Sequence, residues 1–242
     1  MNRNKIINTL TELLKPDEHV HALWLEGSDA TGRLDKYSDI DVCICVDENA
    51  VDTVFRKVQE TFPTDFMHVN YPNDSERQLV FHGTGTDKYL MVDFNAYFYS
   101  KANTTFVKGD KIDACKVLFD KNESIQYRDY DPSECAGECD YWKEESEYRF
   151  SQISRVEKYC LRGLFPEAFV YYQKYVVEPL VFTLRRKYTP TKIWYYMVHI
   201  SDHIPQTEVE RLNRILQVSG VKDILANLSF AEEWYQELTR ES

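Results

Sequence analysis

The sequence predicts a mixed α/β domain followed by a bundle of helices. Up to about residue 131, short apolar runs separated by turn residues alternate with helical patterns, as in a sheet that is covered by helices. From about residue 132 onward, large apolar residues recur at helical spacing over longer segments with short links. We therefore expect an α/β (α+β) domain with a mixed sheet over residues 1–131 and a helical bundle over residues 132–242.

Composition and charge exclude several classes of protein. The chain has 242 residues, and its 29 Lys and Arg against 40 Asp and Glu give a net charge of −11, which disfavours binding to nucleic acid or to anionic lipid. Six cysteines form no evident framework, and Cys43 and Cys45 lie in an apolar run, which favours reduced thiols in a cytoplasm. The N-terminus lacks the apolar core of a signal peptide, and no apolar run approaches the roughly 18 residues of a membrane span. We expect a soluble, cytoplasmic protein.

The elements of the first domain follow from apolar spacing and turn residues. Ile6, Leu10 and Leu14 predict a helix that ends near Lys15. Two apolar runs then predict strands, with a tight turn and a short helix between them. Gly83-Thr84-Gly85 is interpreted as a hairpin turn rather than a phosphate loop, because strand patterns flank it closely on both sides. The predicted strands cover residues 23–25, 42–46, 65–69, 78–82, 89–98 and 115–120, the last as an edge strand, and a second helix covers residues 50–61.

A Gly-Ser turn follows the first predicted strand. Gly27 permits a sharp turn and lets the backbone approach a ligand closely. Ser28 is expected to cap the short helix that follows, whose free N–H groups favour a phosphate. Because Gly-Ser is also a common turn without chemical function, its meaning depends on the residues that accompany it.

Two acids open the next buried strand, in the stretch Ser38-Asp39-Ile40-Asp41. Alternation along a strand places Asp39 and Asp41 on one face, with their Cα atoms about 6–7 Å apart. Two carboxylates beside a phosphate cradle form a site for Mg²⁺ that carries a nucleoside triphosphate. An Asp at the mouth of a strand is otherwise a turn former or a helix cap. The combination of turn and acids therefore carries the prediction.

Asp93 is an isolated acid in the apolar and aromatic strand predicted over residues 89–98. A buried carboxylate without a partner is costly, and two unit charges 4 Å apart repel by about 4 kcal/mol at an effective dielectric constant near 20. We expect Asp93 to face the site of the other two acids, with Mg²⁺ balancing the three charges. An ion pair with Arg77 or Lys88 is the alternative.

The second domain reads as four or five helices with short links. Two other signals occur in it. Cys135, Cys139, His199 and His203 have spacings that suit zinc, but His203 lies at a predicted helix end, so a structural metal is disfavoured. The basic run 185–187 is interpreted as a helix C-terminus that faces solvent. Helices are predicted over residues 141–161, over 166–187 with a kink at Pro179, over 191–200, and from the capping boxes Thr207–Glu210 and Ser229–Glu232 onward.

The motif of the first domain resembles a known signature. The pattern G-S-x₁₀-D-x-D is similar to that of the nucleotidyltransferase superfamily related to polymerase β, and above all to the small bacterial enzymes that adenylylate aminoglycosides or lincosamides. Members often read G-S-x-A-R-G, whereas this chain has Thr31 in place of the arginine, and Arg33 is a possible substitute. The resemblance covers the first domain, and the bundle matches only in type and position. The residues that match are Gly27, Ser28, Asp39 and Asp41.

The resemblance implies an enzyme in which a hydroxyl of a small-molecule acceptor attacks the α-phosphate of ATP or another nucleoside triphosphate. Asp39, Asp41 and Asp93 would hold Mg²⁺, as one ion or two, with Asp93 as third ligand, general base or both. The bundle would bind the acceptor, and nucleic acid and membrane are not expected as partners. A catalytically silent regulatory or antitoxin-like protein is the alternative, against which the intact acids argue. The residues expected to bind the nucleotide are Gly27, Ser28, Ser38 and Arg33.

Overall fold

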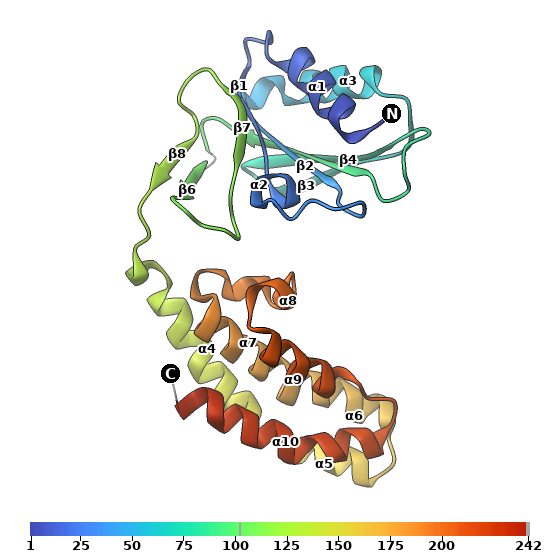
Figure 1. Cartoon of the computed structure of the whole chain (residues 1–242), viewed down its shortest axis with the longest axis vertical. Helices are drawn as coiled ribbons and strands as arrows, with labels where there is room; N and C mark the ends of the chain where they lie inside the picture. Colours follow the sequence, from blue (N-terminus) through green and yellow to red (C-terminus); the bar gives the residue numbers. More distant parts are fainter. Residues whose placement is uncertain (102, 241–242) are drawn as a thin grey trace. The chain divides into compact units, whose positions relative to one another are not determined.

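The chain folds as two compact units, Met1–Tyr130 and Asp131–Ser242. The computed structural model describes residues 1–101 and 103–240 (Figure 1). The first unit is a mixed α/β domain, and the second is formed by helices and their links. The predicted fold class is therefore confirmed. No helix in the described part of the chain is long and apolar enough to cross a membrane.

A six-stranded mixed sheet forms the centre of the first unit, with the strand order β3-β4-β5-β2-β1-β7. β2 and β5 run parallel, and the other neighbours in the sheet are antiparallel. β4 and β5 pair as neighbours, which confirms the turn predicted between them. The strands are β1 Val20–Leu25, β2 Ile40–Val46, β3 Thr64–Asn73, β4 Glu76–Gly83, β5 Met91–Phe98 and β7 Lys116–Asp120.

Helices α1 (Arg3–Leu14) and α3 (Val51–Thr61) cover one face of this sheet (Figure 1). Their apolar stripes pack into one core with the inward side chains of the strands. The short 3₁₀ helix η1 (Glu48–Ala50) leads into α3, and the short helix α2 (Gly27–Thr31) follows β1. η1, α3 and the β3–β4 hairpin form the long connection that the parallel strands β2 and β5 require.

A smaller apolar cluster is formed by the side chains that alternate with those of the main core along the central strands. In this cluster, Trp24 and Cys43 pack with Phe106 and Ile125. Phe106 belongs to β6 (Thr105–Val107), which pairs with β8 (Gln126–Arg128) in a two-stranded sheet. The sequence did not predict these strands, because three residues are too few to show an alternating pattern. β7 is the edge strand of the main sheet, as predicted, but β8 follows it in the chain.

The second unit packs its helices around one core that includes Tyr172, Leu184 and Trp234. A kink was predicted at Pro179, and a π-helical turn lies just before this residue. Because a proline provides no N–H for a regular helical bond, the helix is irregular there. The elements are η2 Pro132–Cys135, α4 Ala136–Phe150, α5 Ser154–Leu161, α6 Phe165–Tyr172, η3 Gln173–Val177, α7 Glu178–Tyr188, η4 Pro190–Tyr195, α8 Ile200–His203, α9 Gln206–Leu216 and α10 Val221–Arg240.

Several predicted helix limits in the second unit are wrong. The helix predicted over residues 141–161 is broken between α4 and α5, where the Ser151 hydroxyl donates to the Tyr148 carbonyl at 2.7 Å. In place of the predicted helix 191–200, a 3₁₀ segment ends at Tyr195, and the next residue, Tyr196, has a φ of 50°. The two capping boxes do not cap: α9 begins at Gln206 after Pro205, and Ser229 lies inside α10. Ser28 likewise does not cap α2, whose N-cap position is Glu26.

Arg185 also departs from its predicted place. We expected the basic run at the end of α7 to face solvent, but the Arg185 side chain is fully buried. Its guanidinium donates to the carbonyls of Tyr196 and Val198, with N–O distances of 2.7 and 2.5 Å, and to His203 Nδ1 at 2.9 Å. The fold uses this arginine to hold the segment that follows α7.

Candidate active site

The turn from β1 into α2 is shaped by Gly27, which has a φ of 56°. A Cβ atom at this position would lie 2.0 Å from the Asp41 Oδ2 atom, a distance that atoms do not adopt. The missing side chain therefore makes room for a carboxylate of the site itself, in addition to allowing the turn. The Glu26 N–H donates to the Asp41 carbonyl at 3.0 Å and holds the turn against β2.

Ser28 presents a buried hydroxyl that has no hydrogen-bond partner in the described part of the chain. A buried polar atom without a partner costs free energy of roughly 1–3 kcal/mol, so an orphan of this kind needs an explanation. In α2, one residue after Gly27, the hydroxyl is placed to accept or donate a bond to a bound group. The phosphate-binding role predicted for Ser28 stays a prediction, and this unsatisfied atom fits it.

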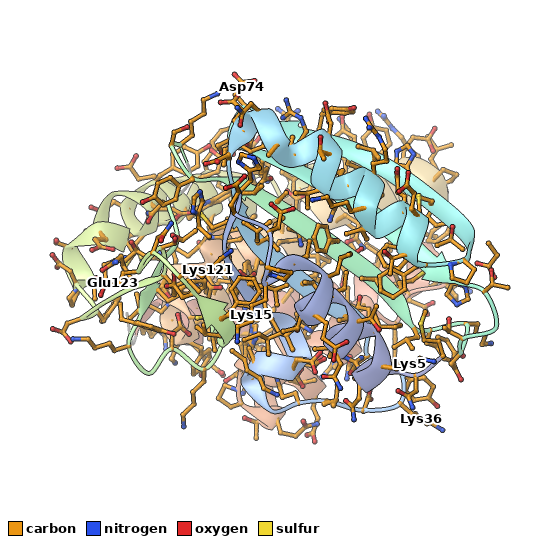
Figure 2. The ribbon with its side chains drawn as sticks, turned by 90° about the horizontal axis from the view of Figure 1, so that it is seen from above. Lys5, Lys15, Lys36, Asp74, Lys121 and Glu123 are labelled. Atoms are coloured by element: carbon orange, nitrogen blue, oxygen red, sulfur yellow. The ribbon has the colours of Figure 1, made fainter. Side chains whose placement is uncertain are left out.

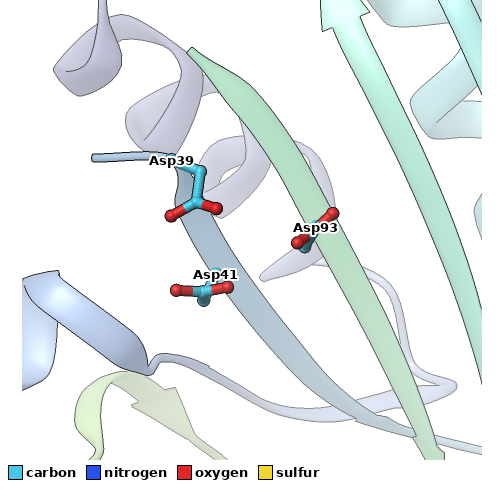
Figure 3. A group of neighbouring side chains, drawn as sticks. All are labelled: Asp39, Asp41 and Asp93. Atoms are coloured by element: carbon cyan, nitrogen blue, oxygen red, sulfur yellow. The ribbon is translucent and has the colours of Figure 1, made fainter. Parts of the chain in front are cut away.

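Three carboxylates gather beside this turn (Figure 3). Asp41 in β2 lies directly opposite Asp93 in β5, because the two parallel strands pair in that register. Asp39 lies one residue before β2, so period-two alternation brings it near Asp41. One oxygen of each carboxylate lies within 4.8 Å of one oxygen of the other two. The structure thus brings together the three acids that the sequence singled out.

The electrostatics of the cluster reflect burial and the crowding of like charges. Burial and, to a smaller extent, the neighbouring carboxylates of Asp39 and Asp93 together raise the pKa of Asp41 to about 7. The pKa of Asp93 is also raised, first by burial and then by Asp39. Three ionised carboxylates at this spacing require either a proton or a cation near neutral pH.

Neither alternative partner of Asp93 pairs with it among the described residues. Arg77 donates to the carbonyls of Asn73 and Glu76, with N–O distances of 3.0 and 2.9 Å. The ammonium of Lys88 lies 4.7 Å from the centroid of the Tyr89 ring. Asp93 is therefore balanced by no cation of the chain in the described residues, which leaves its charge available to the cluster.

The donor set fits a hard divalent cation. Three carboxylates offer only oxygen atoms, which Mg²⁺ prefers, and they provide no sulfur or imidazole for zinc. The number of carboxylates is compatible with one ion or with two ions that share a ligand. Among the described residues, the fold thus assembles these three carboxylates into a group that could hold a metal ion.

Two further predicted nucleotide-binding residues lie close by in sequence but have local partners. The Ser38 hydroxyl donates to Asp35 Oδ1 at 3.0 Å and accepts from the Asp35 N–H at 3.0 Å, so it stabilises its own turn. Arg33 Nε donates to the Thr31 hydroxyl at 3.2 Å, and that hydroxyl donates to the Gly27 carbonyl at 2.8 Å. The guanidinium of Arg33 thus lies beside the position where related motifs have arginine.

Three charged residues near the cluster were not found from the sequence. Glu26 accepts a bond from Trp24 Nε1 at 2.7 Å, and burial raises its pKa. Arg3 at the start of α1 pairs with Asp29 in α2, and burial raises the pKa of Asp29 although Arg3 opposes this. The contact between Arg3 and Asp29 joins segments far apart in the chain, so no local pattern marks it.

A cavity of about 640 Å³ lies within the second unit, among α7, α9 and α10. Glu208 in its wall accepts from Trp234 Nε1 at 2.8 Å, and Arg211 donates to Glu237 at 2.8 Å. The guanidinium of Arg214 lies 3.8 Å from the centroid of the Phe230 ring. These charged side chains already have partners within the second unit. We therefore assign the candidate active site to the acid cluster of the first unit.

The family of the chain follows from a comparison with known proteins. The family model described as streptomycin adenylyltransferase matches residues 1–242, the whole chain. The chain is therefore a nucleotidyltransferase. More particularly, it belongs to the streptomycin adenylyltransferase family. No curated protein sequence matches the chain.

Three solved structures show remote similarity to this chain. The non-canonical poly(A) polymerase complex GLD-2–GLD-3 is 14% identical over 40% of this chain and 36% of that chain, with a TM-score of 0.30. The GLD-2/RNP-8 complex is 12% identical over 91% and 70%, with a TM-score of 0.33. JHP933 from Helicobacter pylori is 9% identical over 98% and 92%, with a TM-score of 0.28. Similarity this weak does not define a fold.

Proposed function

We propose that the protein is a magnesium-dependent adenylyltransferase that moves AMP from ATP to a hydroxyl group of an aminoglycoside or lincosamide antibiotic. The observation that carries this proposal is the cluster of Asp39, Asp41 and Asp93, whose carboxylates are too close to stay ionised together without a cation. The family shows nucleotidyl transfer to a small molecule. The dependence on Mg²⁺, the use of ATP and the particular acceptor are our proposals.

The residues of the first unit divide the work of the reaction. Asp39 and Asp41 would hold Mg²⁺, which would supply charge to the phosphates of the bound nucleotide. The orphaned hydroxyl of Ser28 would donate to a phosphate oxygen, and Gly27 leaves the space in which the Asp41 carboxylate lies. Arg33 is a candidate for a further phosphate contact. The acceptor hydroxyl attacks the α-phosphorus, the bond to pyrophosphate breaks, and the hydroxyl proton passes to a base.

Asp93 is our candidate for that base, in addition to its role as a ligand. Burial and Asp39 raise its pKa, which brings a carboxylate closer to the range in which it accepts a proton from an attacking hydroxyl. As a ligand, it must remain ionised while the cation is bound. One oxygen can coordinate while the other accepts the proton, so the two roles are compatible.

We assign recognition of the acceptor to the second unit. This follows from the order of the chain, in which the helical unit comes after the last strand, and from the small-molecule substrate of the family. The name of the family favours an aminoglycoside such as streptomycin as the first acceptor to test.

The test measures pyrophosphate release from each common nucleoside triphosphate with a panel of aminoglycosides and lincosamides. We expect release that depends on ATP, Mg²⁺ and one class of acceptor, and that is lost in Asp41→Asn. ATP should also raise the melting temperature in Mg²⁺ and much less in EDTA. A chain that shows no magnesium-dependent thermal shift with any triphosphate would overturn the proposal. Release that needs Mg²⁺ but no member of the panel would overturn only the choice of acceptor.

A further inference from the structure

Arg3 connects the two segments that carry the candidate active site. Its Nη1 atom donates to the carboxylate of Asp29, which lies next to Ser28 in α2. Its Nη2 atom donates to the carbonyl of Ser38 and, at 2.6 Å, to the carbonyl of Asp39. One guanidinium therefore binds both the turn after β1 and the backbone of a member of the acid cluster.

Arg3 belongs to a helix that is firmly packed against the domain. Arg3 is the first residue of α1, and the Asn2 side chain caps this helix by accepting from the Lys5 N–H at 3.0 Å. Ile6 and Leu10 on the same helix are fully buried in the core of the unit. The side chain of Arg3 is 14% exposed and that of Asp29 is 6% exposed, so water screens their interaction little.

The loop before β2 has few anchors in the core. Residues 33–37 are exposed, and Leu34 and Tyr37 have 49% and 55% of their surface accessible. Local bonds between Asp35 and Ser38 shape the turn but do not attach it to the domain. The ties to distant segments include an edge contact between Tyr37 and Tyr89, with 5.1 Å between ring centroids, and the two bonds from Arg3.

We propose that Arg3 is a positioning residue that fixes Asp39 in the metal-binding geometry, and this rests on the proposed function. Three carboxylates that repel one another move apart unless their backbones are restrained. A planar guanidinium with several donors in fixed directions imposes such a restraint on Asp39 and on α2 together. Arg3 touches no reacting atom. Its effect on catalysis passes through the position of Asp39.

Charge is a second route by which Arg3 can act, and it predicts a different result. Without Arg3, the buried carboxylate of Asp29 loses its partner and adds a negative charge beside the cluster, because Asp29 already raises the pKa of Asp41. If charge alone mattered, Arg3→Lys would behave like the wild type, and adding Asp29→Asn to Arg3→Met would restore activity. If position matters, Arg3→Lys keeps only part of the activity and the double variant recovers none, because a lysine cannot make all the bonds of Arg3 and a methionine makes none of those to the Ser38 and Asp39 carbonyls.

The experiment compares Arg3→Met, Arg3→Lys and the double variant Arg3→Met/Asp29→Asn with Lys5→Met as a matched control. Lys5 lies on the same helix, carries the same charge and is exposed (Figure 2). The binding of Mn²⁺, as a probe of the metal site, is measured by the electron paramagnetic resonance of the free ion. kcat and the KM for ATP are measured with the acceptor saturating. The folded fraction is followed by circular dichroism.

We expect Arg3→Met to weaken Mn²⁺ binding by about tenfold and to lower kcat by about 10–100-fold, since an error of about 1 Å in a site costs up to about 10²-fold. Arg3→Lys should be intermediate, the double variant should not recover, and Lys5→Met should lie within about twofold of the wild type. The circular dichroism of each variant should show a folded protein.

Each other outcome is decisive. A wild type that binds neither Mn²⁺ nor ATP refutes the proposed function itself. A wild type that binds both, beside an Arg3→Met variant with equal Mn²⁺ affinity and equal kcat, refutes the positioning role. Losses that match the unfolded fraction show a purely structural arginine and also refute it. Full recovery in the double variant shows that charge, rather than position, is what Arg3 contributes.

Discussion

The two units place charged side chains in opposite kinds of surroundings. In the first unit, Asp39, Asp41 and Asp93 crowd three like charges together, and burial, reinforced by the neighbouring carboxylates, raises the pKa of Asp41 to about 7. In the second unit, Arg185 is fully buried but donates to several acceptors, among them two backbone carbonyls and His203. Among the described residues, the negative charges of the cluster are not balanced by the chain, whereas the chain supplies hydrogen-bond acceptors for the arginine.

This difference separates a site from a structural device. A buried group whose bonds are all made within the chain stabilises one conformation, here the segment after α7, where Tyr196 has a φ of 50°. A group whose bonds are incomplete lowers stability until a ligand completes them. The acids and the orphaned Ser28 hydroxyl belong to the second kind. Stability measurements without ligand can therefore test which kind each residue is.

The largest effect is expected from Arg185→Met. This variant removes the charged hydrogen bonds of a fully buried guanidinium to the carbonyls of Tyr196 and Val198, which should lower the free energy of unfolding by about 3–5 kcal/mol. Urea denaturation of the full chain measures it. Arg155→Met on α5 is the matched control, because Arg155 is exposed and donates only at the surface to Gln152. It should change stability by about 0.5 kcal/mol or less. Equal losses in the two variants would refute the structural role of Arg185.

Asp41→Asn should change stability in the opposite direction. In EDTA at pH 8, the neutral amide removes the repulsion from Asp39 and Asp93 at almost constant volume. After a discount for the solvent that reaches this partly exposed group, we expect a gain of about 1–2 kcal/mol in the free energy of unfolding. Catalysis should be lost in the same variant. A variant that is less stable than the wild type in EDTA would show that the acids do not strain the fold.

The strain in the cluster should depend on pH. The folded-state pKa of Asp41 lies above its value in the unfolded chain, so the stability that its protonated form contributes is fully present below about pH 4 and is lost as the pH rises through about 7. Metal-free wild type should therefore lose stability relative to Asp41→Asn between pH 4 and pH 8, when both are followed by thermal unfolding. Parallel curves for the two proteins would contradict this assignment. Mg²⁺ should reduce the difference at pH 8, because it favours the ionised form.

The smallest change in stability is expected from Ser28→Ala. Its hydroxyl has no partner to lose and its burial is unfavourable, so the free energy of unfolding without ligand should rise slightly, by about 1 kcal/mol or less. Binding of ATP in Mg²⁺ should nevertheless weaken by about five- to tenfold, the equivalent of about one hydrogen bond. Thr183→Ala offers a contrast in the bundle, because its buried hydroxyl donates to the Pro179 carbonyl at 2.7 Å. Unchanged ATP affinity in Ser28→Ala would remove Ser28 from the phosphate site.

The local parts of the candidate site could be predicted from the sequence. Gly27 and Ser28 directly follow an apolar run, and Asp39 and Asp41 alternate into the next one. A turn residue and a period of two are properties of neighbouring residues, so their consequences can be inferred without a fold. The same holds for the division into a mixed sheet and helices, which depends on periodicity along the chain.

Tertiary structure alone decided the rest. Asp93 meets Asp41 because parallel β2 and β5 pair in one register, whereas the sequence offered only the cost of burying an acid. Arg3 reaches partners 26 to 36 residues away, and Arg185 is buried under a segment whose backbone departs from the predicted helix. Charged residues look alike in a sequence whether they face solvent or a carbonyl. Their roles depend on contacts between distant segments, which only the packed chain brings together.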